Sequence, residues 1–116
     1  MQLDYVVMGH FDADAALRAL SHPHRRRMLQ LVADVERTSS DLAVRCRLSR
    51  PATSQHLKVL READLVSVRA DGNRRLYRAR ADRVADVLKM LDDFWGDRLA
   101  TLRDEVEGSS RRRRRP

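Results

Sequence analysis

The sequence of 116 residues has little cysteine, few aromatic residues and no long apolar run, and each shortage excludes a class of protein. Its single cysteine, Cys46, cannot form a disulfide within the chain, which is typical of an intracellular protein. No apolar stretch approaches the roughly 20 residues that a membrane-spanning helix needs. The N-terminal residues also lack the basic and apolar regions of a signal peptide. We therefore expect a cytoplasmic protein with no membrane partner.

The composition indicates one folded domain with an aliphatic core. Hydrophobic residues make up 42% of the chain and aromatic residues only 4%, so the core must be filled mainly by leucine, valine, alanine and methionine. The net charge is +7, and Arg111–Arg115 contribute five of these positive charges. The overall charge therefore says little about function, and the positions of the basic residues matter more.

Four segments of the first half carry apolar residues at the three- and four-residue spacing of amphipathic helices. Residues that favour helix N-termini precede three of them: Asp12 or Asp14, Thr38 or Ser39, and Ser49. Pro23 and Pro51 fall in first turns, where the missing N–H costs nothing. The sequence therefore predicts four consecutive short helices between residues 12 and 63.

The second half changes its period twice. Val66, Val68 and Ala70 alternate with polar residues, and the Asp71-Gly72 pair that follows predicts the turn of a β-hairpin. From Asp82 to about Glu107 the apolar residues return to helical spacing, which predicts one long helix ended by residues 108–110.

The expected fold is mainly α with a small β-hairpin. Its element order is that of a winged helix-turn-helix, with about five helices and a two-stranded wing. We expect an N-terminal arm at residues 1–11, a DNA-binding and dimerisation domain at residues 12–107, and a basic disordered tail at residues 108–116.

The fourth helix would be the recognition helix of such a domain. In this arrangement the N-terminal half of the second helix enters the major groove, where Gln pairs with adenine and Arg with guanine. Basic residues around the hairpin turn would contact phosphates or the minor groove. His56 lies between the polar and apolar faces, so both a packing role and a DNA role stay open. The predicted DNA-binding residues are Ser49, Arg50, Thr53, Ser54, Gln55, His56, Lys58, Arg69, Asn73, Arg74 and Arg75.

The long last helix carries an apolar stripe that a chain of this length cannot easily cover by itself. We expect this stripe and the first helix to form a homodimer interface, although Phe94 and Trp95 could also line a ligand pocket. The predicted interface residues are Leu17, Leu20, Val84, Val87, Leu88, Leu91, Trp95, Leu99 and Leu102.

Three segments in this order resemble the ArsR/SmtB family of bacterial winged-helix repressors. They are "LSHPHRRRMLQLV", "SDLAVRCRLSRPATSQHLKVLREADLV" and "VRADGNRRLYR", and together the resemblance covers residues 12–107. It implies a homodimer that binds a two-fold-symmetric operator in double-stranded DNA. Many family members release DNA when a metal or another effector binds, or when thiols are oxidised, so an unknown small-molecule effector is a further possible partner.

The sequence departs from the family pattern at its metal sites. Thr38 and Ser40 stand where the best-known site has two cysteines, and no histidine occurs from residue 57 onward. His22 and His24, with His10 upstream, could form a zinc site but also fit ordinary loop composition. We expect no metal and no cofactor. Asp64 replaces the usual glycine after the recognition helix, a position where aspartate can still adopt a left-handed cap.

Two alternative functions stay open beside this prediction, and a third class, an enzyme, is not expected. Cys46 is either a small buried hydrophobic residue or a thiol activated by neighbouring arginines, which would make the protein a redox-responsive regulator. The arginine tail could instead drive nonspecific binding, as in a nucleoid-type or RNA-binding protein. An enzyme is not expected, because no nucleophile–base pair, phosphate-binding glycine loop or metal triad stands at a useful spacing.

Overall fold

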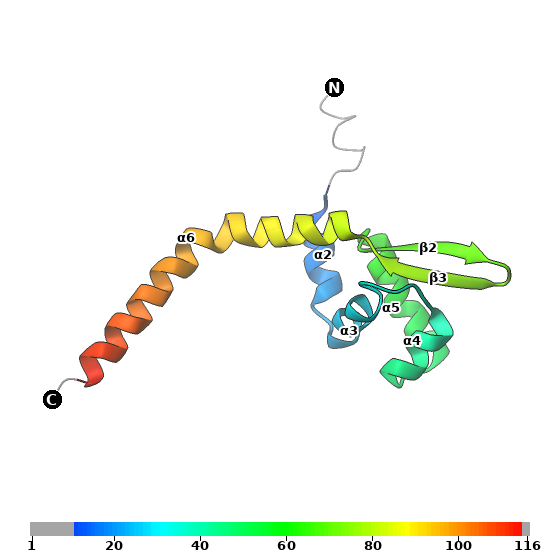
Figure 1. Cartoon of the computed structure of the whole chain (residues 1–116), viewed down its shortest axis with the longest axis horizontal. Helices are drawn as coiled ribbons and strands as arrows, with labels where there is room; N and C mark the ends of the chain where they lie inside the picture. The colour runs from blue at the N-terminus through cyan, green and yellow to red at the C-terminus, as the bar shows by residue number, and fades with distance from the viewer. Residues whose placement is uncertain (1–10, 115–116) are drawn as a thin grey trace, which may run out of the picture. The chain divides into compact units, whose positions relative to one another are not determined.

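The computed structural model describes residues 11–114, and these form five helices and three strands (Figure 1). In chain order they are α2 (Ala13–Leu20), α3 (Pro23–Leu31), β1 (Arg37–Thr38), α4 (Ser39–Cys46), α5 (Arg50–Glu62), β2 (Val66–Asp71), β3 (Arg74–Ala79) and α6 (Ala81–Arg114). The mainly α fold with a hairpin is confirmed. The chain forms one compact unit up to Asp86 and a second from Val87 onward. All but one residue of the predicted N-terminal arm lies outside the described range.

Local side-chain chemistry determines where the first four helices begin. The side chains of Asp12, Thr38 and Ser49 accept hydrogen bonds from backbone N–H groups in the first turns of α2, α4 and α5. Pro23 and Pro51 occupy first turns, as predicted. The cap of α3 was not predicted: Nδ1 of His22 accepts a hydrogen bond from the backbone N–H of His24 at 3.1 Å.

Aliphatic side chains from several elements form the core of the first unit. Leu57 and Leu60 of α5 are fully buried with Met28 of α3 and Leu42 of α4. Burying each of these side chains contributes about 1.5–3 kcal/mol. The core therefore fixes the buried side of α5 and leaves its opposite side to solvent.

The hairpin belongs to a three-stranded antiparallel sheet with the strand order β1-β3-β2. Gly72, with φ of 65°, is in the two-residue turn between β2 and β3, where a side chain would strain the backbone. The third strand is a correction to the predicted two-stranded wing. Strand β1 has only two residues, Arg37 opposite Tyr77 and Thr38 opposite Leu76, so no sequence period reveals it.

Asp64 adopts the left-handed conformation predicted for it, with φ of 61°. The turn that follows α5 therefore forms without glycine, and Leu65 donates its backbone N–H to the carbonyl of Leu60 at 3.0 Å. This turn leads directly from the recognition helix into β2.

Helix α6 is longer than predicted. It was expected to end at Glu107, but it continues through Gly108 and both serines to Arg114. The physical reason is that one glycine and two serines cost only about 2 kcal/mol of helix propensity together, whereas arginine is a good helix former. Among residues 11–114, no helix combines the length and apolar character needed to cross a bilayer.

Candidate nucleic-acid interface

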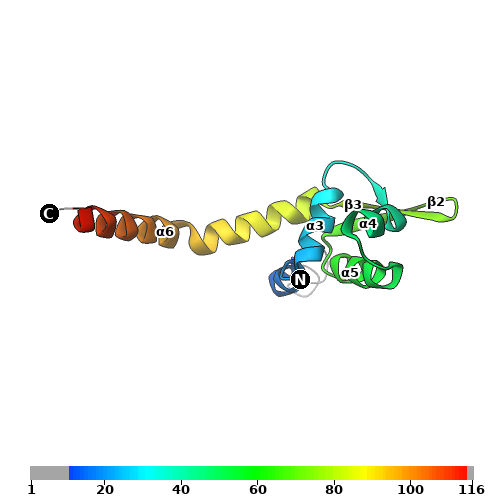
Figure 2. The same cartoon turned by 90° about the horizontal axis from the view of Figure 1, so that it is seen from below.

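Helices α4 and α5 form a helix-turn-helix, and they lie side by side in both Figure 1 and Figure 2. The turn consists of residues 47–49. Arg47 ends α4 in the left-handed conformation, with φ of 56°, and the backbone N–H of Leu48 reaches back to the carbonyl of Ala43 at 3.0 Å. Ser49 then caps α5. This tight turn sets the angle at which α5 leaves the core.

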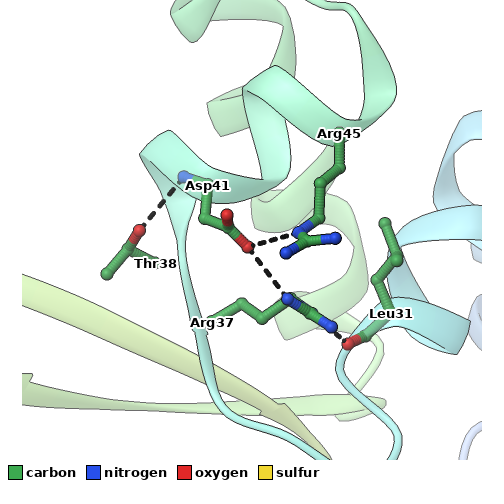
Figure 3. A network of polar contacts seen from close by, with 5 residues as sticks. All are labelled: Leu31, Arg37, Thr38, Asp41 and Arg45. Carbon is green, nitrogen blue, oxygen red and sulfur yellow. Dashed lines mark hydrogen bonds and ion pairs between the residues drawn. The ribbon is translucent and has the colours of Figure 1, made fainter.

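A network of polar contacts holds the N-terminal end of α4 (Figure 3). The carboxylate of Asp41 accepts hydrogen bonds from Arg45 Nε at 2.8 Å and from Arg37 Nη1 at 3.2 Å. Arg37 Nε donates to the carbonyl of Leu31 at 2.7 Å, which connects the network to α3. The Thr38 hydroxyl accepts from the Asp41 N–H at 3.1 Å. The network therefore positions the first helix of the helix-turn-helix.

The substitution Asp41→Asn will lower the free energy of unfolding by about 1 kcal/mol at neutral pH, because both arginines lose their anionic partner. The hydrogen bond from Arg45, and also that from Arg37, lowers the pKa of Asp41 below its usual 3.8. The stabilisation is therefore fully present above the usual pKa of 3.8, and it is lost as the pH falls through the lower pKa that Asp41 has in the folded chain. Denaturant titration of both proteins at pH 7 and pH 3 measures this difference.

Asp34→Asn is the matched control for this substitution, because Asp34 is exposed and has no ion pair among the described residues. Its unfolding free energy should stay within about 0.5 kcal/mol of the unsubstituted chain. Equal losses for the two variants would contradict the role given to Asp41.

The outer face of α5 is open and polar. Arg50, Ser54, Gln55 and Lys58 are exposed, and their side chains form no hydrogen bond or ion pair with the side chains described at residues 11–109. Thr53 is a correction to the predicted DNA-binding set. It is only 1% exposed, and its hydroxyl donates to the Ser49 carbonyl at 2.9 Å, so it belongs to the core.

His56 is half-buried at the edge of this face. Its ring centroid lies 4.5 Å from that of His22, and its Nδ1 lies 3.4 Å from Nη1 of Arg25. Of the two roles left open by the sequence, these contacts favour packing between α5 and the start of α3.

The wing arginines differ in their partners. Arg69 makes a two-pronged contact with Glu36, at 2.7 and 2.9 Å, and this hydrogen bonding lowers the pKa of Glu36. Arg74 pairs with Asp71 at 2.8 Å across the turn. Arg75 is exposed and has no ion pair within the described part of the chain. Arg75 is therefore the wing arginine most available to a phosphate, while Arg69 chiefly fastens the wing to the loop before β1.

Two adjoining polar clefts separate the recognition helix from the wing. The larger, about 450 Å³, is lined by Thr38, Ser39, Ser40, Arg50, Asn73, Arg74 and Arg75. The smaller, about 310 Å³, is lined by Ser39, Ser54, Leu57, Lys58, Arg61, Arg75 and Tyr77. Ser39 and Arg75 line both. Neither set of described lining residues includes a carboxylate, so the clefts together form a basic groove suited to a polyanion.

The predicted DNA-binding set lacks six of the residues that line this groove: Thr38, Ser39, Ser40, Leu57, Arg61 and Tyr77. Ser39 and Arg61 show how two of them could be missed. Arg61 lies three and seven positions after Lys58 and Ser54, so helical spacing alone could have placed it on the same face. Ser39 was considered only as a cap. The chain brings it to the groove by pairing β1 with β3, which the sequence does not reveal.

The thiol of Cys46 is buried, with 8% of the residue exposed. Burial raises its pKa, and the opposing effect of the Arg27 charge is smaller. A thiol with a raised pKa has little of the thiolate that reacts with oxidants. Burial and the raised pKa therefore favour the other reading, in which Cys46 is a small hydrophobic residue that fills a core position of α4.

Among residues 11–114 no group of three histidine, cysteine, aspartate or glutamate side chains is arranged to hold a metal ion. His22 and His24 lie near each other and near His56, but Nδ1 of His22 already accepts a backbone hydrogen bond. His10 lies outside the described residues.

Helix α6 exposes an apolar stripe along its length. Six large side chains are 38–67% exposed at spacings of three or four residues: Leu88, Leu91, Trp95, Leu99, Leu102 and Val106. In α2, Leu17 is 45% exposed and Leu20 is half-buried; Val84 is also half-buried. Val87 is only 6% exposed, so it offers little surface to a second copy.

A helix-turn-helix followed by a hairpin wing, with a basic groove between them, defines a winged-helix nucleic-acid-binding domain.

Comparisons with known proteins agree with this class of domain. A family model described as a helix-turn-helix domain matches residues 20–69. The HTH-type transcriptional regulator Rv2034 of Mycobacterium tuberculosis is 40% identical over 82 residues, which cover 71% of this chain and 77% of that protein. The probable mercury resistance operon repressor of Streptomyces lividans is 35% identical, covering 73% and 68%.

A solved structure of a possible transcriptional regulator for arsenical resistance is similar with a TM-score of 0.68. It is 42% identical in sequence, and the match covers 77% of this chain and 93% of that one. The chain belongs to the ArsR/SmtB family of winged helix-turn-helix transcriptional regulators.

Proposed function

We propose that this chain is a homodimeric repressor that binds a two-fold-symmetric operator in double-stranded DNA. The observation that carries the proposal is the exposed face of α5 beside the basic groove. Ser54, Gln55 and Lys58 have no competing partner among the described residues, and Arg75 lines the smaller cleft together with Ser54 and Lys58. Family membership supports the same class of activity.

The side chains of this face have two roles: some identify bases, and others bind phosphates and position the DNA. The Gln55 amide both donates and accepts, so it can form the paired hydrogen bonds that identify adenine in the major groove. Lys58, Arg61 and Arg75 are positive charges that hold phosphates and carry no sequence information. Arg50, at the start of α5, lines the larger cleft, and its guanidinium can bind either a base or a phosphate.

The apolar stripe of α6 supports a dimer. Its exposed side chains repeat every 11 residues, since Leu88, Leu91 and Trp95 are followed by Leu99, Leu102 and Val106. That spacing averages about 3.67 residues per turn, so the stripe runs nearly parallel to the helix axis. A second copy of the chain presents the same stripe and covers it. Two recognition helices would then address half-sites about 34 Å apart.

Paired alanine substitutions on α5 test this division of roles. Gln55→Ala should cost about 1–3 kcal/mol at the base it reads and should remove the preference at that position only. Lys58→Ala should weaken binding to every duplex and reduce the slope of log affinity against log salt by about 1. Titration of a selected operator and its single-base variants at several salt concentrations measures both.

The two variants control for each other, because Gln55 and Lys58 are exposed on the same helix and neither supports the core. If both substitutions lowered affinity for all duplexes equally, or if neither had an effect, α5 would not be the reading element.

A further inference from the structure

Three histidine rings from two helices meet where α3 begins. His22 caps α3, His24 lies in its first turn, and His56 belongs to α5. The ring centroids of His22 and His56 are 4.5 Å apart, and those of the other two pairs are 5.4 and 5.8 Å apart. We call these three residues and Arg25 the histidine joint. It connects the N-terminal end of α3 to the middle of the recognition helix.

The hydrogen bonds of the joint require two of the rings to be neutral. Nδ1 of His22 accepts from the backbone N–H of His24 at 3.1 Å. Nδ1 of His56 lies 3.4 Å from Nη1 of Arg25, and a guanidinium can only donate, so this nitrogen must accept. Each ring therefore carries its proton on Nε2. A second proton would occupy the accepting nitrogen and break the contact.

Arg25 is fixed at this place by two other bonds. Its Nε donates to the carbonyl of Ala19 at 2.6 Å, and its Nη2 donates to the carbonyl of Arg18 at 3.0 Å, both at the C-terminal end of α2. The guanidinium thus fastens α2 to α3 while facing α5. Because it cannot move away without losing these bonds, a protonated His56 would meet a held positive charge.

The charges around the joint all act in the same direction. His24, Arg25 and Arg26 of α3 face His22, while His22, His24 and Arg25 face His56. From α2, the carbonyl groups of Ala19 and Arg18 accept hydrogen bonds from Arg25. No carboxylate among the described residues acts on either ring.

Burial, and then the neighbouring cationic groups, lowers the pKa of both His22 and His56 below the usual 6.5. Since the folded chain holds these protons less tightly than the unfolded chain, the unfolded state binds more protons once the pH falls towards 6.5. The stability supplied by the neutral rings is therefore present above about pH 6.5 and is lost as the pH falls through and below this value.

We propose that the histidine joint is a pH-sensitive element, in which protonation of His22 and His56 loosens the seating of α5 and weakens DNA binding. The readout in DNA affinity depends on the function proposed above. His56 directly follows Gln55 on α5, so a shift of the joint moves the residue that reads bases. Added positive charge alone strengthens DNA binding, so a loss of affinity in acid cannot come from general electrostatics.

The test replaces both accepting rings with groups that do not gain a proton between pH 7.5 and pH 5.5. In the double variant His22→Asp and His56→Gln, aspartate keeps a strong cap for α3 and the glutamine oxygen keeps an acceptor for Arg25. The probe is a DNA duplex selected by the unsubstituted chain. From pH 7.5 to pH 5.5 the unsubstituted chain should lose about tenfold in affinity, together with a lower unfolding midpoint. The double variant should lose neither.

His24→Gln is the matched control, because the ring of His24 accepts no hydrogen bond in the joint, and it should keep the pH response of the unsubstituted chain.

Parallel pH responses of the unsubstituted chain and the double variant would overturn the proposal. If no duplex were bound at any pH, the proposed function would fail, whereas the unfolding midpoints would still decide about the joint. If the double variant folded poorly, NMR titration of the His22 and His56 rings would decide, and titration at or above pH 6.5 would contradict the proposal.

Discussion

Leu99→Glu in α6 will convert the proposed dimer to a monomer and lower its operator affinity roughly 100-fold, the loss expected when two linked recognition helices act separately. Leu99 is 52% exposed in the single chain, at the centre of the apolar stripe. A carboxylate there would be buried without a partner in the interface, which costs several kcal/mol. The fold of the single chain should be unchanged, because the side chain contributes little to its core. Sedimentation equilibrium and operator titration measure the two effects.

Ala100→Glu provides the matched control. It adds the same charge one residue along the helix, on an exposed position rotated by about 100° from the stripe. The control should remain a dimer with nearly full affinity. A dimer that survived Leu99→Glu would show that the stripe is not the contact between two copies.

Arg75→Ala in β3 will lower affinity for every duplex by about tenfold and will reduce the salt slope by about 1, because one phosphate contact is lost. Arg75 lines both clefts of the basic groove and has no ion pair among the described residues. Preference between bases should persist, since a phosphate contact carries no sequence information.

Arg78→Ala removes the same charge from the same strand and serves as the comparison. Arg78 is exposed but lines neither cleft, and it stands an odd number of positions from Arg75, on the opposite face of the strand. We expect no more than a twofold loss for it. Equal losses for the two arginines would mean that only overall charge matters and that the groove does not seat the DNA backbone.

Much of the first unit could be predicted from the sequence because its signals are local. Capping residues and first-turn prolines affect only the backbone within about four residues. Asp12, Thr38 and Ser49 are such caps. The buried stripe of Thr53, Leu57 and Leu60 follows from helical period alone, and this period should have excluded Thr53 from the DNA-binding set.

The features that were missed depend on contacts between distant residues. Strand β1 exists only through its pairing with β3, and Glu36 reaches Arg69 across 33 positions. His56 reaches Arg25 across 31 positions. Such contacts changed the interpretation of individual site residues: they removed Arg69 from the free cations of the wing, made Arg75 the prominent one, and gave His56 a packing role.

The end of α6 illustrates a different limit. A glycine and two serines in succession favour a helix end by propensity, yet the difference from a good helix former is only about 2 kcal/mol over the three residues. The four arginines that follow outweigh it, and the helix continues to Arg114. Propensity in a short window could not decide between these outcomes.

Selection of binding sites from random duplexes tests the central claim most directly, with the full chain and a chain lacking residues 108–116 compared side by side. If α5 reads DNA in a dimer, both proteins will enrich the same two-fold-symmetric sequence, with half-sites about one helical turn apart. The shortened chain will bind it with a smaller salt slope, because it has lost Arg111–Arg115. Enrichment of no sequence, of an asymmetric one, or of a sequence only by the chain with its arginine tail would contradict the account.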